Sequence, residues 1–366
     1  MPAPLARLHR IPAASPDDVA GLEALIRTGA LDPAAIVAIL GKTEGNGCVN
    51  DFTRGFATRA LRDCLAAKIG AAAADRVLLV MSGGTEGALS PHWLVFERTQ
   101  GSTDAAAGFD GGSLALGTTI TRDLRPEEIG RGAQVETVRD GVFAAMRAAG
   151  IVDPADVHLV QIKCPLLTSA RVADARARGH DTASADTLKS MGLSRGASAL
   201  GVALALGEIE APDEGRIGTD MSLYSARAST SAGIELMGHE ILVLGMSTRW
   251  RGPLAVGHAV MRDVVDAAPV RALTERLGVG ASAEVVALVA KAEASRTGLV
   301  RGSRHTMNED SDLAATRHAR AFVGGVLAGL VGTTELFVSG GAEHQGPDGG
   351  GPVAVIVRRR AGTGAP

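Results

Sequence analysis

One short pattern, Ser-Gly/Ala-Gly followed one residue later by Glu, occurs three times in this chain and most limits how the chain can fold. The copies lie at residues 82–86, 231–235 and 339–343. Their spacing is longer than the roughly 20 to 50 residues of a solenoid repeat and fits three copies of a domain-sized unit. We therefore predict three related units within the 366 residues.

Each copy is accompanied by a lysine and an arginine in the same order along the chain. The lysines end apolar runs and are Lys42, Lys163 and Lys291. Between each lysine and the following motif lies an arginine, which is Arg54, then Arg195, then a member of the cluster containing Arg317 and Arg320. Identical polar residues at matching places are not a packing requirement, because a core needs volume and a turn needs only glycine. A shared central pocket would need them.

The strand and helix signals alternate, which indicates a fold of α+β type with mixed α/β character. We predict unit A at residues 1–103, unit B at 112–249 and unit C at 254–366, arranged with pseudo-threefold symmetry around one central site. Glycine, serine and aspartate mark a first linker near residues 99–112. Buried strands are expected at 35–40, 76–81, 114–121, 157–162, 254–260 and 335–338, and helices at 52–70, 193–206 and 313–330. The apolar run before Lys291 fits a strand or a helix equally well.

Composition excludes several classes of function. The net charge is −3 and no basic run occurs, so nothing indicates binding to nucleic acid. The N-terminal segment has no apolar core of signal-peptide length, and no run of 18 uninterrupted apolar residues, as a membrane span would need, occurs elsewhere. The three cysteines show no Cys-x-x-Cys spacing, which argues against a disulfide framework and a thiolate zinc site. We expect a cytoplasmic protein with a small-molecule ligand.

The three lysines differ in their sequence neighbours. Lys42 is followed at the second position by Glu44, and Lys291 by Glu293. On a strand, such a carboxylate lies on the same face as the lysine and favours the charged ammonium. We therefore expect Lys42 and Lys291 to bind substrate rather than to accept protons.

Lys163 stands between Ile162 and Cys164 in an apolar run with no nearby carboxylate. Apolar surroundings favour the neutral form of an amine, and only a neutral amine can take a proton from a serine. Lys163 is therefore the predicted base and Ser231 the predicted nucleophile of a Ser-Lys pair.

Nine blocks of the chain resemble the cyanuric acid hydrolase and barbiturase family of ring-opening amidohydrolases. They lie at residues 41–54, 81–92, 122–131, 163–168, 191–201, 231–236, 291–295, 317–321 and 339–352. The resemblance implies three units around one site, a Ser-Lys pair from each unit, hydrolysis of a cyclic imide and a homotetramer. The family pattern favours Arg320 as the third arginine, whereas local alignment with the other two units favours Arg317.

The implied substrate matches the repeat. Cyanuric acid is a six-membered ring in which three carbonyls alternate with three N–H groups, so three equivalent donor sets could bind every carbonyl at once. The expected donors are the serines and the amides that follow them, together with the arginines: Ser82, Gly83, Ser231, Ala232, Ser339, Gly340, Arg54, Arg195 and Arg320. Ring opening would give carboxybiuret, which loses CO2 to form biuret. The alternatives are barbituric acid as the substrate and a non-catalytic binder of planar, nucleobase-like rings.

The resemblance also implies a structural divalent cation near the C-terminal loop and no organic cofactor. Its ligands would be the Glu293 carboxylate and oxygens of Ala342, Gln345, Gly346, Pro347 and Gly350. Oxygen-only ligands suit Mg²⁺ or Ca²⁺, and a cation would order a loop that is rich in glycine. The alternative is a loop held by hydrogen bonds alone, with Glu293 paired to Lys291.

Overall fold

Three four-stranded sheets form the framework of the protein in a computed structural model that describes residues 2–101 and 112–360. Each sheet lies within one of the predicted units, and most of the predicted first linker lies outside the described residues. The sheet of unit A is ordered β1-β4-β2-β3. Its elements are β1 (Pro4–Pro12), α1 (Ala20–Arg27), β2 (Ile36–Thr43), α2 (Phe52–Ile69), α3 (Ala71–Ala74), β3 (Leu78–Gly83) and β4 (His92–Gln100).

The sheet of unit B repeats this order as β5-β8-β6-β7. Its elements are β5 (Ser113–Ile120), α4 (Gly132–Ala149), β6 (Val157–Pro165), α5 (Ser169–Ala177), α6 (Thr187–Ala205), β7 (Ala228–Gly233) and β8 (Glu240–Ser247).

The sheet of unit C has the order β9-β14-β10-β13, accompanied by a small hairpin, β11-β12. Its elements are β9 (Leu254–Met261), α7 (Ala268–Arg276), β10 (Ala283–Ala292), β11 (Leu299–Val300), β12 (Ser303–Arg304), α8 (Ala315–Val331), β13 (Phe337–Gly340) and β14 (Gly351–Arg359).

Each sheet contains one parallel pair of strands, and the other neighbouring strands are antiparallel. The parallel pairs are β2 with β3, β6 with β7, and β10 with β13. A parallel pair needs a crossover connection, and helices α2, α6 and α8 provide it in the three units. The mixed α/β fold and its repeated units are therefore as predicted.

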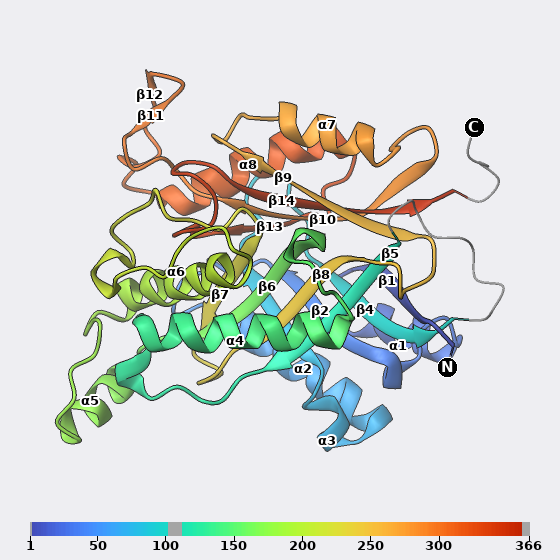
Figure 1. The fold of residues 1–366 in the computed structure, drawn as a ribbon, viewed down its shortest axis with the longest axis horizontal. Helices are drawn as coiled ribbons and strands as arrows, with labels where there is room; N and C mark the ends of the chain where they lie inside the picture. The colour runs from blue at the N-terminus through green and yellow to red at the C-terminus, as the bar shows by residue number, and fades with distance from the viewer. Residues whose placement is uncertain (1, 102–111, 361–366) are drawn as a thin grey trace.

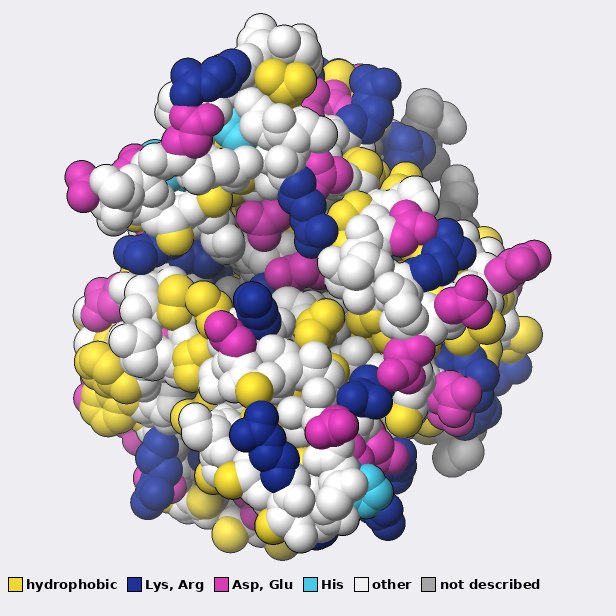
Figure 2. All heavy atoms as spheres, turned by 90° about the vertical axis from the view of Figure 1, so that its left-hand side faces the viewer, with side chains coloured by type: hydrophobic (Ala, Val, Ile, Leu, Met, Phe, Trp, Pro, Cys, Tyr) yellow, Lys and Arg dark blue, Asp and Glu magenta, His cyan; other side chains and the backbone are white. Residues whose placement is uncertain are grey.

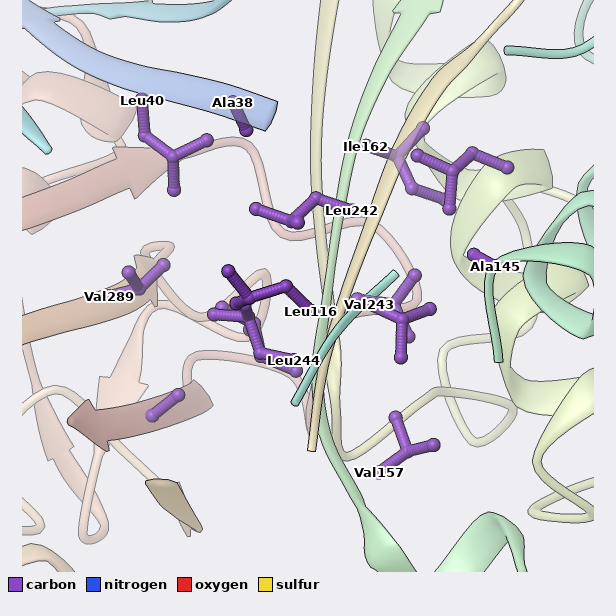
Figure 3. Packing of buried hydrophobic residues seen from close by; sticks show 14 of the residues in the cluster. Ala38, Leu40, Leu116, Ala145, Val157, Ile162, Leu242, Val243, Leu244 and Val289 are labelled. Atoms are coloured by element: carbon purple, nitrogen blue, oxygen red, sulfur yellow. The ribbon is translucent and has the colours of Figure 1, made fainter. Parts of the chain in front are cut away.

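The interior is built where the three sheets face one another, with the helices on the outside (Figure 1). Leu40 of β2, Leu242 and Leu244 of β8 and Val289 of β10 belong to one buried cluster that draws residues from all three units. Figure 3 shows these side chains meeting between the sheets, while Val243 points the opposite way. Side chains alternate along β8, so one face of the strand packs into the central core and the other face packs against helix α4.

Several elements differ from the sequence prediction. The run before Lys291, which pattern left unassigned, is strand β10, and helix α6 begins at Thr187, so Arg195 lies inside it rather than at its start. Strands β1, β4 and β14 were not predicted. All residues of β7 are buried, including the polar Ser229, Thr230 and Ser231. None of the helices within the described ranges is long and apolar enough to cross a membrane.

Candidate active site

The parallel strand pairs place each lysine directly opposite the serine of its own unit. The paired residues are Lys42 with Ser82, Lys163 with Ser231, and Lys291 with Ser339. Parallel strands end at the same edge of a sheet, so lysine and serine side chains are delivered together there. Sequence order alone predicted these partners, and the strand register places them opposite each other.

The three serines converge on one point although they come from three sheets. The hydroxyl oxygen of Ser339 lies 3.2 Å from that of Ser82 and 3.4 Å from that of Ser231. All three side chains are buried. The predicted pseudo-threefold arrangement therefore brings these hydroxyls into one cluster.

The serines line a small inner cavity together with most of the predicted binding residues. Its lining is Gly47, Arg54, Ser82, Gly83, Met191, Arg195, Ser231, Ala232, Arg320, Ser339 and Gly340. A wider vestibule of about 700 Å³ shares Arg195, Arg320 and Gly340 with this cavity and adds Lys189 and Arg317. The face that carries α5 and the β11-β12 hairpin is hollowed near its middle, where basic and acidic side chains gather (Figure 2).

Two of the lysines contact their own serines. Lys42 Nζ lies 3.4 Å from Ser82 Oγ, and Lys291 Nζ lies 3.3 Å from Ser339 Oγ. Lys163 Nζ instead donates to the carbonyl oxygen of Met81, 3.1 Å away, which directly precedes Ser82. The lysines lie behind the serines and are almost completely buried.

The carboxylates expected beside Lys42 and Lys291 form no ion pair with them among the described residues. Glu44 is exposed, and the Glu293 carboxylate accepts the backbone N–H groups of Ala294 and Ala342 instead of pairing with Lys291. Burial lowers the pKa of Lys42 well below its ordinary value and lowers the pKa of Lys291 to about 7. Sequence neighbours two positions along a strand therefore do not determine the charge of these amines.

The prediction that no acid accompanies Lys163 is wrong. The carboxylate oxygen of Glu235 lies 2.8 Å from Lys163 Nζ, and the lysine side chain is only 1% exposed. Glu235 is far from Lys163 in sequence, but it follows Ser231 by four residues in the neighbouring strand and the turn after it. This carboxylate was visible in the sequence as the last residue of the repeated motif.

Two of the predicted arginines are held by glutamates of the same motif in another unit. Arg195 donates to both carboxylate oxygens of Glu343, at 2.8 and 2.7 Å, and Arg320 binds both oxygens of Glu86. Burial alone would raise the pKa of Glu343, but the guanidinium of Arg195 lowers it to about 2. Sequence reasoning had assigned no role to these glutamates.

Arg54 completes the set of arginines at the cavity, but it is held differently. Its guanidinium donates to the carbonyl oxygens of Ala232 and Cys48, at 3.0 and 2.6 Å. Of the two candidates for the third arginine, Arg320 lines the inner cavity, whereas Arg317 lines the vestibule. The geometry thus favours Arg320.

Four of the six predicted cation ligands line another cavity of about 440 Å³, which borders the vestibule. Glu293, Ala342, Gly346 and Pro347 line it, together with Asp348 and Asn308. Burial and the nearby Glu343 raise the pKa of Glu293, and no ion pair to it occurs among the described residues. A carboxylate that lies beside a cavity and forms no ion pair fits a bound cation.

Two of the predicted ligands are placed less favourably. The side chain of Gln345 accepts the N–H of Thr230 and donates to Gly341, so its amide is already used, and Gly350 is not among the lining residues. No group of three or more His, Cys, Asp or Glu residues suited to a metal occurs in the described part of the chain. A cation here would depend on Glu293 and on neutral oxygens.

Comparison with known proteins places the chain in a family. Residues 7–358 match the model of the amidohydrolase ring-opening proteins. A cyanuric acid amidohydrolase of Azorhizobium caulinodans is 61% identical over 361 residues, covering 98% of this chain and 100% of the relative.

Two solved structures agree with that match. A cyanuric acid hydrolase from A. caulinodans superposes with a TM-score of 0.91 at 60% identity, covering 97% of this chain and 99% of the other. A second cyanuric acid hydrolase, described as a product of structural concatenation, has a TM-score of 0.93 at 50% identity over 97% of this chain and 100% of the other. The chain is therefore a member of the amidohydrolase ring-opening family.

Proposed function

We propose that this protein hydrolyses cyanuric acid by opening its ring, with Ser231 as the nucleophile and Lys163 as the base. The observation that carries the proposal is the convergence of three lysine-serine pairs on one cavity, in a chain whose relatives are named cyanuric acid amidohydrolases. A ring with three identical sides suits a site with three nearly identical walls.

Binding would use one donor set from each unit. Each set contains a serine hydroxyl, the backbone amide after it and an arginine, and all of these groups line the inner cavity. Hydrogen bonds from charged donors to carbonyl oxygens are stronger than those from neutral donors, so the arginines would hold the ring firmly. The donors around the attacked carbonyl would also stabilise the oxyanion that forms there.

In the proposed reaction, Ser231 Oγ forms a bond to a ring carbonyl carbon while its proton passes to Lys163 Nζ. The tetrahedral intermediate collapses, the C–N bond breaks, and Lys163 returns the proton to the departing ring nitrogen. Water then hydrolyses the acyl group on Ser231 and releases carboxybiuret, which loses CO2 to give biuret.

We also propose that Glu293 holds a divalent cation with backbone oxygens of Ala342, Gly346 and Pro347. The cation would neutralise the Glu293 carboxylate and order the loop at residues 340–350, and it would add no step to the chemistry at Ser231. A homotetramer and a cytoplasmic location, both expected from the sequence, belong to the same proposal. Light scattering of the purified protein measures the first.

The test is a comparison of three serine variants. We expect Ser231→Ala to lose turnover of cyanuric acid while still binding it, as measured by biuret release and by calorimetry. Ser82→Ala and Ser339→Ala are expected to weaken binding but to retain measurable turnover. Turnover that survives Ser231→Ala would remove Ser231 from its role. Barbituric acid, assayed in parallel by loss of ring absorbance, tests the alternative substrate, and turnover of neither ring would favour a binding protein.

A further inference from the structure

The glutamates that end the three repeated motifs are used in two different ways. In two units the glutamate is bound by an arginine of another unit. Arg195 of unit B binds Glu343 of unit C, and Arg320 of unit C binds Glu86 of unit A. Repeating the same step once more would have Arg54 of unit A bind Glu235 of unit B.

That third ion pair is absent from the salt bridges of the described residues. Arg54 donates to two carbonyl oxygens, and its Nε lies 3.6 Å from a carboxylate oxygen of Asp51. Asp51 caps helix α2 by accepting the N–H of Thr53, and it also accepts the N–H of Gly47. The guanidinium is therefore held by Cys48 and Asp51 of its own unit and by a backbone carbonyl of unit B, while the Glu235 carboxylate pairs with Lys163.

The backbone of the motif changes together with this exchange of partners. Gly84 and Gly341 have φ angles of +105° and +73°, and a Cβ at either position would lie within 2.4 or 2.5 Å of the guanidinium of Arg320 or Arg195. Gly233, the equivalent residue of unit B, is not among the described glycines with positive φ. A Cβ there would meet the carboxylate of Glu235 at 2.1 Å. The motif of unit B is therefore built around a carboxylate rather than around an arginine.

We propose that Glu235 is a positioning residue for Lys163 and that it distinguishes the Lys163–Ser231 pair from the two other lysine-serine pairs. The inference rests on the proposed function. Glu235 fixes Lys163 Nζ at the end of the strand opposite Ser231. It also stabilises the ammonium that forms when Lys163 takes the serine proton, before that proton moves to the ring nitrogen. Lys42 and Lys291 have no such ion pair among the described residues and instead hydrogen-bond their own serines.

Other charged groups lie near the Lys163–Glu235 pair, and their effect on the pH dependence has to be distinguished from that of Glu235. Arg54 on α2 and Arg171 on α5 both act on Glu235. Glu240 on β8 pairs in register with Lys163 and accepts the N–H of Leu79, and burial raises its pKa to about 7. Because Glu240 could itself titrate near neutral pH, the variant Glu240→Gln belongs in the experiment.

The experiment measures kcat and KM for cyanuric acid between pH 5.5 and 10 in the full-length protein. A neutral Lys163 is needed for attack, so kcat should rise with pH along an acid limb. In Glu235→Gln the ammonium loses its partner and gives up its proton more easily. We therefore expect the acid limb to move to lower pH by about one unit and kcat to fall by about 100-fold.

Glu86→Gln is the matched control, because Glu86 occupies the same place in the motif of unit A. Its loss frees Arg320, so we expect a raised KM and an acid limb at the wild-type pH. Glu235→Asp keeps the charge and is expected to keep the wild-type limb at reduced kcat. Glu240→Gln should leave the limb in place.

Three outcomes would overturn the inference. The first is an acid limb of the kcat profile that stays at the wild-type pH in Glu235→Gln. The other two are an acid limb that shifts as far in Glu235→Asp, or in Glu86→Gln, as it does in Glu235→Gln. Failure of the proposed function gives a different result, since Ser231→Ala would then still turn over substrate whatever the Glu235 variants do.

Discussion

Lys291 of unit C donates a hydrogen bond from Nζ to the carbonyl oxygen of Thr230, 3.0 Å away in unit B and one residue before Ser231. The same contact occurs twice more around the site. Lys42 donates to Val338, and Lys163 donates to Met81, in each case the residue before a serine of another unit. Each lysine therefore holds the serine strand of a neighbouring unit. Removing one of these ammonium groups within the folded protein would leave a buried carbonyl without its partner, at a cost of about 1 to 3 kcal/mol.

The position of Arg320 in the inner cavity leads to a prediction about the third arginine. Arg320→Ala should lower kcat/KM for cyanuric acid by roughly 100-fold, which corresponds to about 3 kcal/mol, because a charged donor is lost and Glu86 is left without its partner. Arg317→Ala, three residues earlier on α8, is the matched control and should change kcat/KM by less than about fivefold. Steady-state kinetics of the two variants measure this, and a larger loss in Arg317→Ala would reverse the assignment.

Burial of Lys42 predicts a dependence of stability on pH. Its pKa is lowered well below 10.5 in the folded protein, so between the two values the unfolded chain binds more protons than the folded chain. The free energy of unfolding should therefore rise as pH increases toward 10.5. Lys42→Met, of similar length and no charge, removes this contribution. Urea denaturation at pH 7.5 and pH 10 should show wild type gaining stability relative to the variant, and parallel changes in both proteins would contradict the prediction.

A histidine pair between units B and C predicts sensitivity to acid. His158 on β6 and His258 on β9 lie with their Nδ1 atoms 2.8 Å apart, and burial lowers the pKa of each to about 4. Between pH 6.5 and 4 the unfolded chain binds protons that the folded chain does not, so stability should be lost as pH falls through this range. The loss should be roughly 1 to 2 kcal/mol per histidine, given their partial exposure.

The double variant His158→Gln/His258→Gln tests this prediction, because glutamine stays neutral over the same range. Chemical denaturation at pH 7.5 and pH 5 should show a smaller loss in the variant than in wild type. An equal loss in both would assign the acid sensitivity to other groups.

The proposed cation predicts a gain in thermal stability that depends on Glu293. Mg²⁺ or Ca²⁺ at about 100 times its Kd should stabilise the folded protein by about 2.7 kcal/mol, which raises the Tm of a chain of this length by roughly 3 to 4 °C. EDTA should remove the gain, and Glu293→Gln should never show it. Glu284→Gln changes an exposed carboxylate on the same strand, β10, and should respond like wild type. Differential scanning calorimetry measures all four conditions, and an equal gain in Glu293→Gln would exclude this residue as the ligand.

Much of the framework could be read from short patterns. The repeated motif predicted three units, and apolar runs ending at Lys42 and Lys163 predicted buried strands that the structure contains as β2 and β6. These features are local, because a run of apolar β-branched residues favours a strand wherever it is buried. The edge strand β1 and strands β4 and β14 escaped prediction, since their pairing depends on partners far along the chain.

The sequence by itself determined which residue types meet at the site, since lysine, arginine and serine recur in one order in each of the three units. Only the tertiary structure decided the charge and partner of each. Glu235 pairs with Lys163 rather than with Arg54, and Glu293 faces a cavity instead of pairing with Lys291. The physical reason is that electrostatic energy depends on distance and burial in space, and these contacts join strands, turns and units that sequence spacing does not relate.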